Sequence, residues 1–261
     1  MPISYYILQL PPFILLLFIV LLFAGIGIAG TYLFRKYGKQ NYKRGHNEIV
    51  GFIFAVLGGF YGLLLGFVVF LVWDSANSAQ TNAGKEGSLA RGLYRDIKYF
   101  PGTAEVKPLM SSYMLFVHSI VEKEYPGMEK MEPYSTFNRK YFNDVFIEVE
   151  KLDAHDTRVA QMFHNLNDLA IARSLRELDG SSEIPREIWL PLIIGALIIL
   201  YMAILVDVES RRLHITVTGL LGGFIGMVIY IIIILDHPFT GKMKIEPTEY
   251  NTILQMEKAG E

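Results

Sequence analysis

The stretch that decides the fold is IVGFIFAVLGGFYGLLLGFVVFLVWD, Ile49–Asp74, whose first 25 residues contain no ionisable side chain. A transmembrane helix needs about 20 predominantly apolar residues, since each adds about 1.5 Å across a hydrocarbon core of about 30 Å. Three further stretches satisfy the same rule: Pro12–Phe34, Trp189–Val206 and Leu213–Leu235. A soluble helix of this length would show a polar face, and none of the four does. The sequence therefore predicts an all-α integral membrane protein with four transmembrane helices.

The composition of the whole chain excludes several classes of protein. The 261 residues are 52% hydrophobic and carry a formal net charge of −2, so there is no basic field to attract a nucleic acid. The chain has no cysteine, which excludes disulfide scaffolds, thiolate metal sites and cysteine catalysis. The apolar excess lies in the four spans, so the expected partner is a lipid bilayer.

The spans fall into two pairs on either side of a polar segment. We predict a first transmembrane hairpin over residues 1–73, a helical extramembrane domain over 74–187, a second hairpin over 188–236 and a C-terminal tail over 237–261. The middle segment has 114 residues, which is too long for a simple loop and indicates a domain.

Proline and glycine divide the middle domain into helices, because both residues interrupt the helical backbone. The stop signals are Pro101-Gly102 and Pro126-Gly127. The expected helices are Asp74–Phe100 as a continuation of the second span, Thr103–Tyr125, and a third from about residue 135 to 178, either unbroken or interrupted near Asp153.

Basic residues beside the spans set the expected orientation, since lysine and arginine collect in cytoplasmic loops. The short loops 35–48 and 207–212 contain Arg35, Lys36, Lys39, Lys43, Arg44, Arg211 and Arg212, whereas residues 1–11 contain no basic side chain. This places both short loops in the cytoplasm and the middle domain outside the cell membrane. Lys85, Arg91, Arg186 and their neighbours beside the other span ends oppose that assignment.

The second and fourth spans share a glycine-rich pattern. Gly58-Gly59-Phe60-Tyr61-Gly62 in the second corresponds to Gly222-Gly223-Phe224-Ile225-Gly226 in the fourth, which fits either a parallel repeat of two hairpins or coincidence. Small residues four apart let helix backbones approach closely in lipid. The predicted helix-packing residues are Gly58, Gly62, Gly66, Gly219, Gly222, Gly223 and Gly226.

The second span also carries a bulky face. Phe52, Val56, Phe60, Leu63, Phe67, Phe70 and Asp74 fall within about 80° of arc at 100° per residue, and the glycines occupy the neighbouring arc. Two interpretations remain open. The bulky face either contacts lipid, or it lines a symmetric axis and forms a hydrophobic constriction that gates ions by dewetting.

Charges near the span ends are candidates for a pore mouth. A ring of arginines concentrates anions and a ring of carboxylates favours cations. The candidates besides Asp74 are Arg173, Arg176 and Asp236, for which the alternatives are solvated membrane anchors and, at Asp236, a turn cap.

No catalytic or cofactor chemistry stands out. The spans contain no Asp, Glu, Lys or Arg, which argues against a proton-coupled transporter. No phosphate-binding loop or serine–histidine pattern is present. His164 with Asp168, and Asp153 with His155 and Asp156, have metal-ligand spacings that ordinary solvated faces share. We therefore expect no metal, no cofactor and no enzymatic activity.

Several stretches resemble the bestrophin-like family of prokaryotic membrane proteins. They are Phe60–Phe67 running into Val72-Trp73-Asp74, Glu86–Ala90 with Leu93-Tyr94-Arg95, Arg173–Arg176 followed by Ile184-Pro185 and Trp189, and Leu235–Gly241. Together they span about residues 50 to 248. Bestrophins are oligomeric anion channels, so the resemblance implies a homo-oligomer, a pentamer, with the second spans around a central pore.

Two features depart from the bestrophin pattern. The bestrophin layout puts the middle domain in the cytoplasm, against the charge distribution above. No acidic calcium-clasp run like that of the animal channels is present, so calcium gating is not implied. The leading hypothesis is a homo-oligomeric, anion-permeable ion channel with a constriction from the second span. The alternative is a non-conducting membrane sensor or scaffold that acts through its helical domain.

Overall fold

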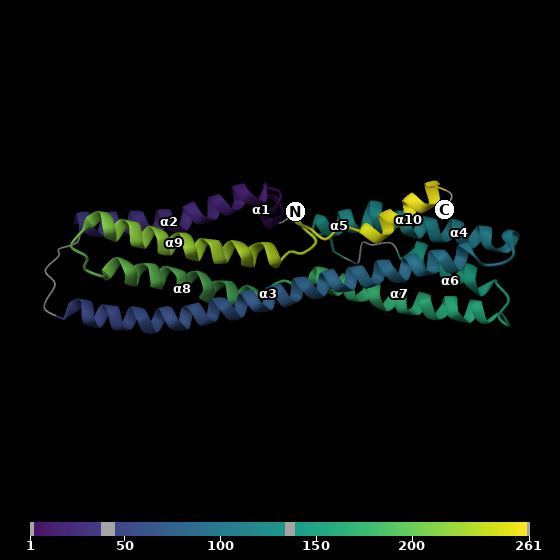
Figure 1. Ribbon diagram of the computed structural model, residues 1–261, viewed down its shortest axis with the longest axis horizontal. Helices are drawn as coiled ribbons and strands as arrows, with labels where there is room; N and C mark the ends of the chain where they lie inside the picture. The colour runs from purple at the N-terminus through teal and green to yellow at the C-terminus, as the bar shows by residue number, and fades with distance from the viewer. Residues whose placement is uncertain (1–2, 38–44, 134–138, 260–261) are drawn as a thin grey trace. The chain divides into compact units, whose positions relative to one another are not determined.

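The computed structural model describes residues 3–37, 45–133 and 139–259, and every regular element in these ranges is helical (Figure 1). The elements are α1 Ile3–Leu8, α2 Pro12–Tyr37, α3 His46–Lys98, α4 Thr103–Ser119, the π-helix η1 Ile120–Glu124, α5 Tyr125–Glu129, α6 Lys140–Glu150, α7 Thr157–Ser181, α8 Arg186–Leu205, α9 Arg211–Leu235 and α10 Thr248–Ala259. In the described residues, four helical stretches are long and apolar enough to cross a membrane, and they contain the four predicted spans.

The chain divides into two compact units. Unit 1 comprises Met1–Gln9, Ser75–Ser182 and His237–Glu261, and unit 2 comprises Leu10–Asp74 and Glu183–Asp236. The predicted domains placed the first nine residues with a transmembrane hairpin and residues 237–261 in a separate tail. In the structure, the described parts of both segments group with the middle segment in unit 1.

In unit 2, α2 and α9 lie side by side and run antiparallel (Figure 1). Glycines make this possible. A Cβ atom at Gly27 would lie 2.5 Å from the carbonyl oxygen of Thr218, and one at Gly226 would lie 2.8 Å from that of Ile19. Gly222 meets the backbone of Phe23 in the same way. The paired positions step by four residues along both helices, so the backbones touch at every turn in this stretch.

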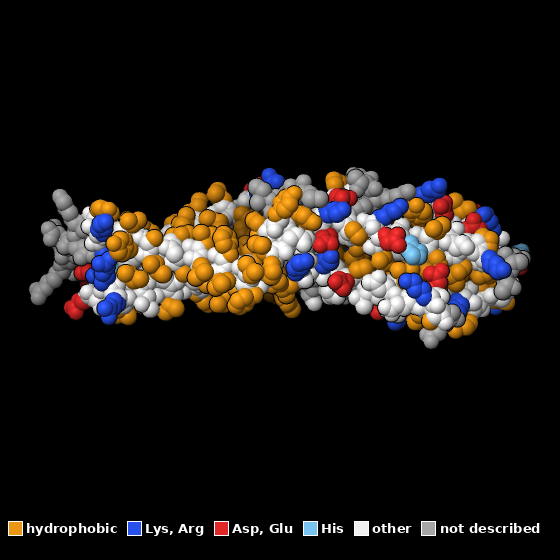
Figure 2. Space-filling model, turned by 90° about the horizontal axis from the view of Figure 1, so that it is seen from above, with side chains coloured by type: hydrophobic (Ala, Val, Ile, Leu, Met, Phe, Trp, Pro, Cys, Tyr) orange, Lys and Arg blue, Asp and Glu red, His pale blue; other side chains and the backbone are white. Residues whose placement is uncertain are grey.

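Polar contacts at one end of unit 2 join its two short loops. Arg35 on α2 donates to the carbonyl oxygen of Val208 at 2.8 Å, and the side chain of Asn47 donates to that of Asp207 at 2.7 Å. Figure 2 shows Lys and Arg side chains gathered at this end and apolar side chains covering the rest of the visible surface of unit 2. The predicted loop residues Lys39, Lys43 and Arg44 lie outside the described residues.

The closest packing among the spans is not between neighbours in the sequence. The main packing partner of the first span, α2, is the fourth span, α9, and not the second. Thr31 strengthens the pairing, since its hydroxyl lies 2.9 Å from that of Thr218 in a buried contact. Chain order alone predicts neighbours in space, but small residues decide which helices can approach closely.

Unit 1 is built around a helical core. The predicted continuation of the second span is confirmed, because α3 runs unbroken to Lys98. The buried side chains of α3 pack in one core with those of α4, α6 and α7. Fully buried members of this core, two from each helix, are Leu93, Ile97, Leu109, Tyr113, Val145, Val149, Leu166 and Leu169. Of the two alternatives left open near Asp153, the structure has the interruption, since α6 ends at Glu150 and α7 begins at Thr157 with Asp156 as its N-cap.

The predicted stop at Pro126-Gly127 is wrong. The helix widens into the π-turn of η1 and then continues as α5 to Glu129. Pro126 has no N–H to give to the carbonyl one turn earlier, and a widened turn directly before it accommodates that loss without ending the helix. The start expected near residue 135 lies outside the described residues, and α6 begins at Lys140.

Candidate functional site

The bulky face of α3 is exposed over the whole length of its span. Phe52 is 71% exposed, Phe60 69% and Phe67 60%. Leu63, Phe70 and Asp74 continue the same stripe and are exposed as well. These six residues form what we call the α3 stripe, which is exposed in the described part of the chain and so is available to lipid or to another copy.

The opposite face of α3 packs into unit 2. Tyr61, Leu65, Val68 and Val72 are all buried, three or four residues apart. The hydroxyl of Tyr61 donates to the carbonyl oxygen of Leu192 on α8 at 3.0 Å, and its ring covers Gly195, where a Cβ would lie 2.6 Å from the ring. These contacts fix the rotation of α3, and therefore the direction in which the α3 stripe faces.

Between these two faces lies the glycine arc of Gly58, Gly62 and Gly66. A Cβ atom at any of the three would meet nothing within 4 Å. In contrast, Gly219, Gly222 and Gly226 on α9 are all covered by α2, whereas Gly223 makes only ordinary contacts. The two glycine patterns therefore differ in their environment: the one on α9 packs within the chain, and the one on α3 is open.

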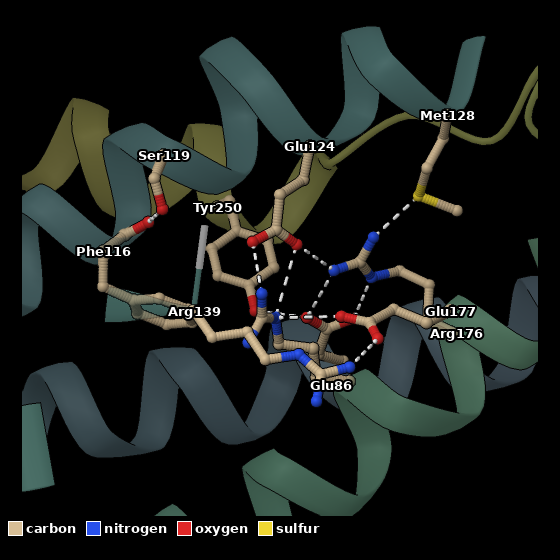
Figure 3. Close-up of polar contacts among 10 residues, drawn as sticks. Glu86, Phe116, Ser119, Glu124, Met128, Arg139, Arg176, Glu177 and Tyr250 are labelled. Atoms are coloured by element: carbon tan, nitrogen blue, oxygen red, sulfur yellow. Dashed lines mark hydrogen bonds and ion pairs between the residues drawn. The ribbon is translucent and has the colours of Figure 1, made fainter. Parts of the chain in front are cut away.

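A network of buried charges lies in unit 1 (Figure 3). The guanidinium of Arg176 pairs with Glu86 through Nε and donates from Nη2 to Glu124 at 2.8 Å. Arg173 donates to the other oxygen of Glu124 at 2.5 Å. The hydroxyl of Tyr250 on α10 donates to Glu86 at 2.9 Å. The network therefore joins α3, η1, α7 and α10.

The rim of the network is partly solvated. Glu177 lies 3.6 Å from Arg173 and accepts from Arg139, which is largely exposed, at 3.1 Å.

Burial opposes the charge of Arg176, but the carboxylates of Glu86 and Glu124 outweigh it and hold the pKa of Arg176 well above the usual range. At Tyr250, by contrast, burial itself raises the pKa well above its ordinary value. The arginines therefore stay charged and the tyrosine stays neutral.

This geometry bears on the predicted pore-mouth charges. Arg173 and Arg176 are 5% and 0% exposed, and their charges are matched by Glu124 and Glu86 inside a single chain. Asp236 is 7% exposed, and its carboxylate accepts from the backbone N–H of Ile184 at 2.7 Å, ahead of α8. Within a single chain, these three groups are therefore paired or capped rather than exposed to solvent. Only Asp74 among the four charge candidates is exposed.

A signal for the network was present in the sequence. Glu86 lies on the apolar stripe Ala79, Ala83, Ala90, Leu93 and Ile97 of α3, at the same spacing of three or four residues. Arg173 and Arg176 lie in the same way on the stripe Val159, Met162, Leu166 and Leu169 of α7. Opposite charges on the buried faces of two amphipathic helices predict an ion pair between them, because a buried charge needs a partner.

The candidate metal ligands form no site. His164 and Asp168 lie 3.2 Å apart on an exposed surface of α7, and Asp156 caps its helix and binds Arg158. Among the described residues, no group of three His, Asp or Glu side chains has the arrangement that a metal ion requires.

Comparison with known proteins identifies the family to which this architecture belongs. A family model described as the Bestrophin-like domain matches residues 21–250. The chain belongs to the Bestrophin-like family. No curated protein sequence matches it.

Solved structures share the fold of this family member. A variant of a bacterial bestrophin homologue from Klebsiella pneumoniae is 15% identical, with a TM-score of 0.71 over 94% of this chain and 99% of the other. A second structure of a bacterial bestrophin homologue from the same organism is 16% identical, with a TM-score of 0.70 over 94% and 97%. With its four candidate spans, this member of the family is a multi-pass membrane protein.

The residues behind the family resemblance have structural roles in the two units. Gly87 lets α10 approach, because a Cβ there would lie 2.5 Å from the Cβ of Glu249. Phe239 packs edge-on against the ring of Tyr125, with centroids 6.1 Å apart. Gly241 has φ +84° and lies against the backbone of Leu8, a position that only glycine fills without strain. These three residues of the family pattern therefore occupy packing positions in unit 1.

Proposed function

We propose that the chain assembles into a homo-oligomeric ion channel in which the α3 stripe of each copy faces a common axis. The stripe supplies rings of phenylalanine and leucine, which form a hydrophobic constriction and gate ions by dewetting. Following the family resemblance, the proposed assembly is a pentamer that conducts inorganic anions.

The observation that carries the proposal is the rotation of α3 in unit 2. The contacts of Tyr61 with Leu192 and Gly195 direct one face of the helix inward, so the α3 stripe faces away from the chain. The adjacent glycine arc is open and smooth, and such an arc suits close packing against a neighbouring copy. In a ring of identical helices, the open glycine arc would pack against the neighbouring copy, and the α3 stripe would face the axis.

Asp74 is the one charged member of the α3 stripe. A ring of carboxylates attracts cations, so Asp74 reduces the anion preference implied by the family resemblance. The reversal potential in a salt gradient measures this balance. A channel that rejects anions altogether would overturn the proposed selectivity and leave conduction itself intact.

The test of conduction is the current of the purified protein in a planar bilayer. Phe67→Ala removes a ring from the proposed constriction, so we expect a several-fold higher current than in the unchanged protein. The matched control is Phe224→Ala on α9, since Phe224 is 62% exposed and lies outside the α3 stripe. A bilayer that stays silent at all voltages, pH values and calcium levels would instead support a sensor or scaffold.

For orientation, we propose that the two short loops of unit 2 are cytoplasmic and that the middle domain is outside, as the basic residues of these loops indicate. The chain has no cysteine, so single cysteines report the side without background. An impermeant thiol reagent on whole cells should label Lys130→Cys and spare Arg212→Cys. The reverse result would place the middle domain in the cytoplasm.

A further inference from the structure

A pocket of about 450 Å³ lies in unit 1, between the last turns of α3 and helix α10. This volume is in the range of small-molecule sites. Among its lining residues are Arg91, Gly92, Arg95 and Lys98 from α3, Tyr99 directly after the end of that helix, and Met256 from α10. Neither the buried charge network nor the α3 stripe includes any of them.

The walls of the pocket are held in place. Residues of α3 recur at three or four positions and therefore share one face of the helix. Helix α10 is fixed against α3 at Gly87, and Tyr250 anchors it in the core by donating to Glu86. At Gly92 a Cβ would meet nothing within 4 Å, so the helix backbone itself is open to a ligand there.

The pocket has an excess of positive charge. It contains Arg91, Arg95 and Lys98, of which Arg91 pairs with Glu249 at 3.1 Å. Lys98 lies over the ring of Tyr94, 5.8 Å from its centroid. Burial raises the pKa of Tyr94, and the charge of Glu257 raises it further. No carboxylate stands among the described lining residues of the pocket, and Arg95 is exposed at its surface.

We propose that this pocket binds a small soluble organic phosphate. Arginine matches phosphate oxygens with two parallel hydrogen bonds, and Arg95 and Lys98 lie one helical turn apart on the wall. Tyr99 is 75% exposed and, with Met256, offers an apolar surface for the ring or sugar of the ligand. Charge and ring surface together select an organic phosphate over a bare anion.

Titration calorimetry of the full-length protein in detergent tests this proposal, with adenosine monophosphate as the probe. We expect saturable binding of the probe, and weaker binding of both inorganic phosphate and adenosine, since each lacks half of the contacts. No heat from the nucleotide, equal binding of inorganic phosphate, or binding only of phosphatidic acid vesicles would overturn the proposal.

Two variants locate the site. Arg95→Gln should weaken binding at least about 10-fold, because it removes a charge-assisted contact. Gly92→Leu should abolish it by filling the pocket, since a Cβ at Gly92 meets nothing within 4 Å. The matched control is Gly84→Leu, an equally open position on α3 outside the pocket, which should bind like the unchanged protein. Gel filtration confirms that each variant is folded. Equal affinity in all three variants would contradict the assignment.

Discussion

Arg176 is the residue on which the interior of unit 1 depends most. Its side chain is completely buried between Glu86 and Glu124. Removal of one partner of a buried ion pair leaves an uncompensated charge, which costs about 3–5 kcal/mol. We therefore expect Arg176→Met to lower the free energy of unfolding by that amount, as measured by denaturant titration in detergent.

The matched control for Arg176 is Arg139→Met, at the rim of the same network. Arg139 pairs with Glu177, but its side chain is 66% exposed, so the expected loss is under about 1 kcal/mol. Equal losses for the two variants would show that burial of the network adds nothing to stability.

Glu129 predicts a pH effect of defined sign. Partial burial acts to raise its pKa, but hydrogen bonds from Lys244 and Gln9 outweigh burial and lower the pKa below its ordinary value of 4.5. Because the pKa is lower in the folded state, ionised Glu129 stabilises that state when the pH is above the ordinary pKa. This contribution is lost as the pH falls through the pKa of the folded state. Since the pair is partly solvated, we expect less than about 1 kcal/mol.

Thermal unfolding measured between pH 7 and pH 3 tests this effect. Glu129→Gln should be less stable than the unchanged protein at pH 7, and the two should converge as the pH falls. A difference between them that stays constant over the whole range would exclude titration of Glu129 as the cause.

At this scale, the sequence predicts hydrophobic character better than the fate of a charge. The α3 stripe follows from spacing alone, because apolar side chains four apart must share a face. The burial of Arg173, Arg176 and Asp236 does not follow from spacing, because a charge near a span end looks the same in sequence whether it is solvated or paired. Their partners lie up to 90 residues away in the chain, at a distance that local patterns do not cover.

The pairing of α2 with α9 is the element-scale contact most sensitive to a single methyl group. A Cβ at Gly222 would overlap the backbone of Phe23, whereas one at Gly223 would lie 3.5 Å from a side-chain carbon of Val20. Gly222→Ala should therefore destabilise the protein by about 1–3 kcal/mol through overpacking. Gly223→Ala should be neutral or stabilising, since alanine favours the helix by about 0.5–1 kcal/mol. Thermal unfolding that ranks the two in the opposite order would contradict this packing.

The helices themselves were largely predictable, because span length, hydropathy and proline stops are local properties. The joining of the chain ends to unit 1 was not. It depends on contacts such as Gly241 with Leu8 and Tyr250 with Glu86, which link distant segments. The short helices α1 and α10 carry weak patterns of their own, and tertiary packing stabilises them.

At the scale of the whole molecule, the open glycine arc of α3 predicts an assembly. Gly62→Val places a branched side chain where the chain itself offers no contact, so each copy should still fold. If the arc packs against a neighbouring copy, native mass spectrometry should show oligomers of the 29.6 kDa chain for the unchanged protein and only the monomer for Gly62→Val. Gly25→Val on α2 is equally open and should keep the assembly. A strictly monomeric unchanged protein would contradict the prediction.

The most direct test of the central claim is whether water reaches Phe67 inside a conducting path. In the cysteine-free chain, Phe67→Cys should form channels whose current falls sharply when a water-soluble, thiol-reactive anion is added. Phe224→Cys, on a face that contacts lipid in the proposed assembly, should be insensitive to the same reagent. Current that persists in the Phe67→Cys protein, or that is lost equally in both proteins, would contradict a pore lined by the α3 stripe.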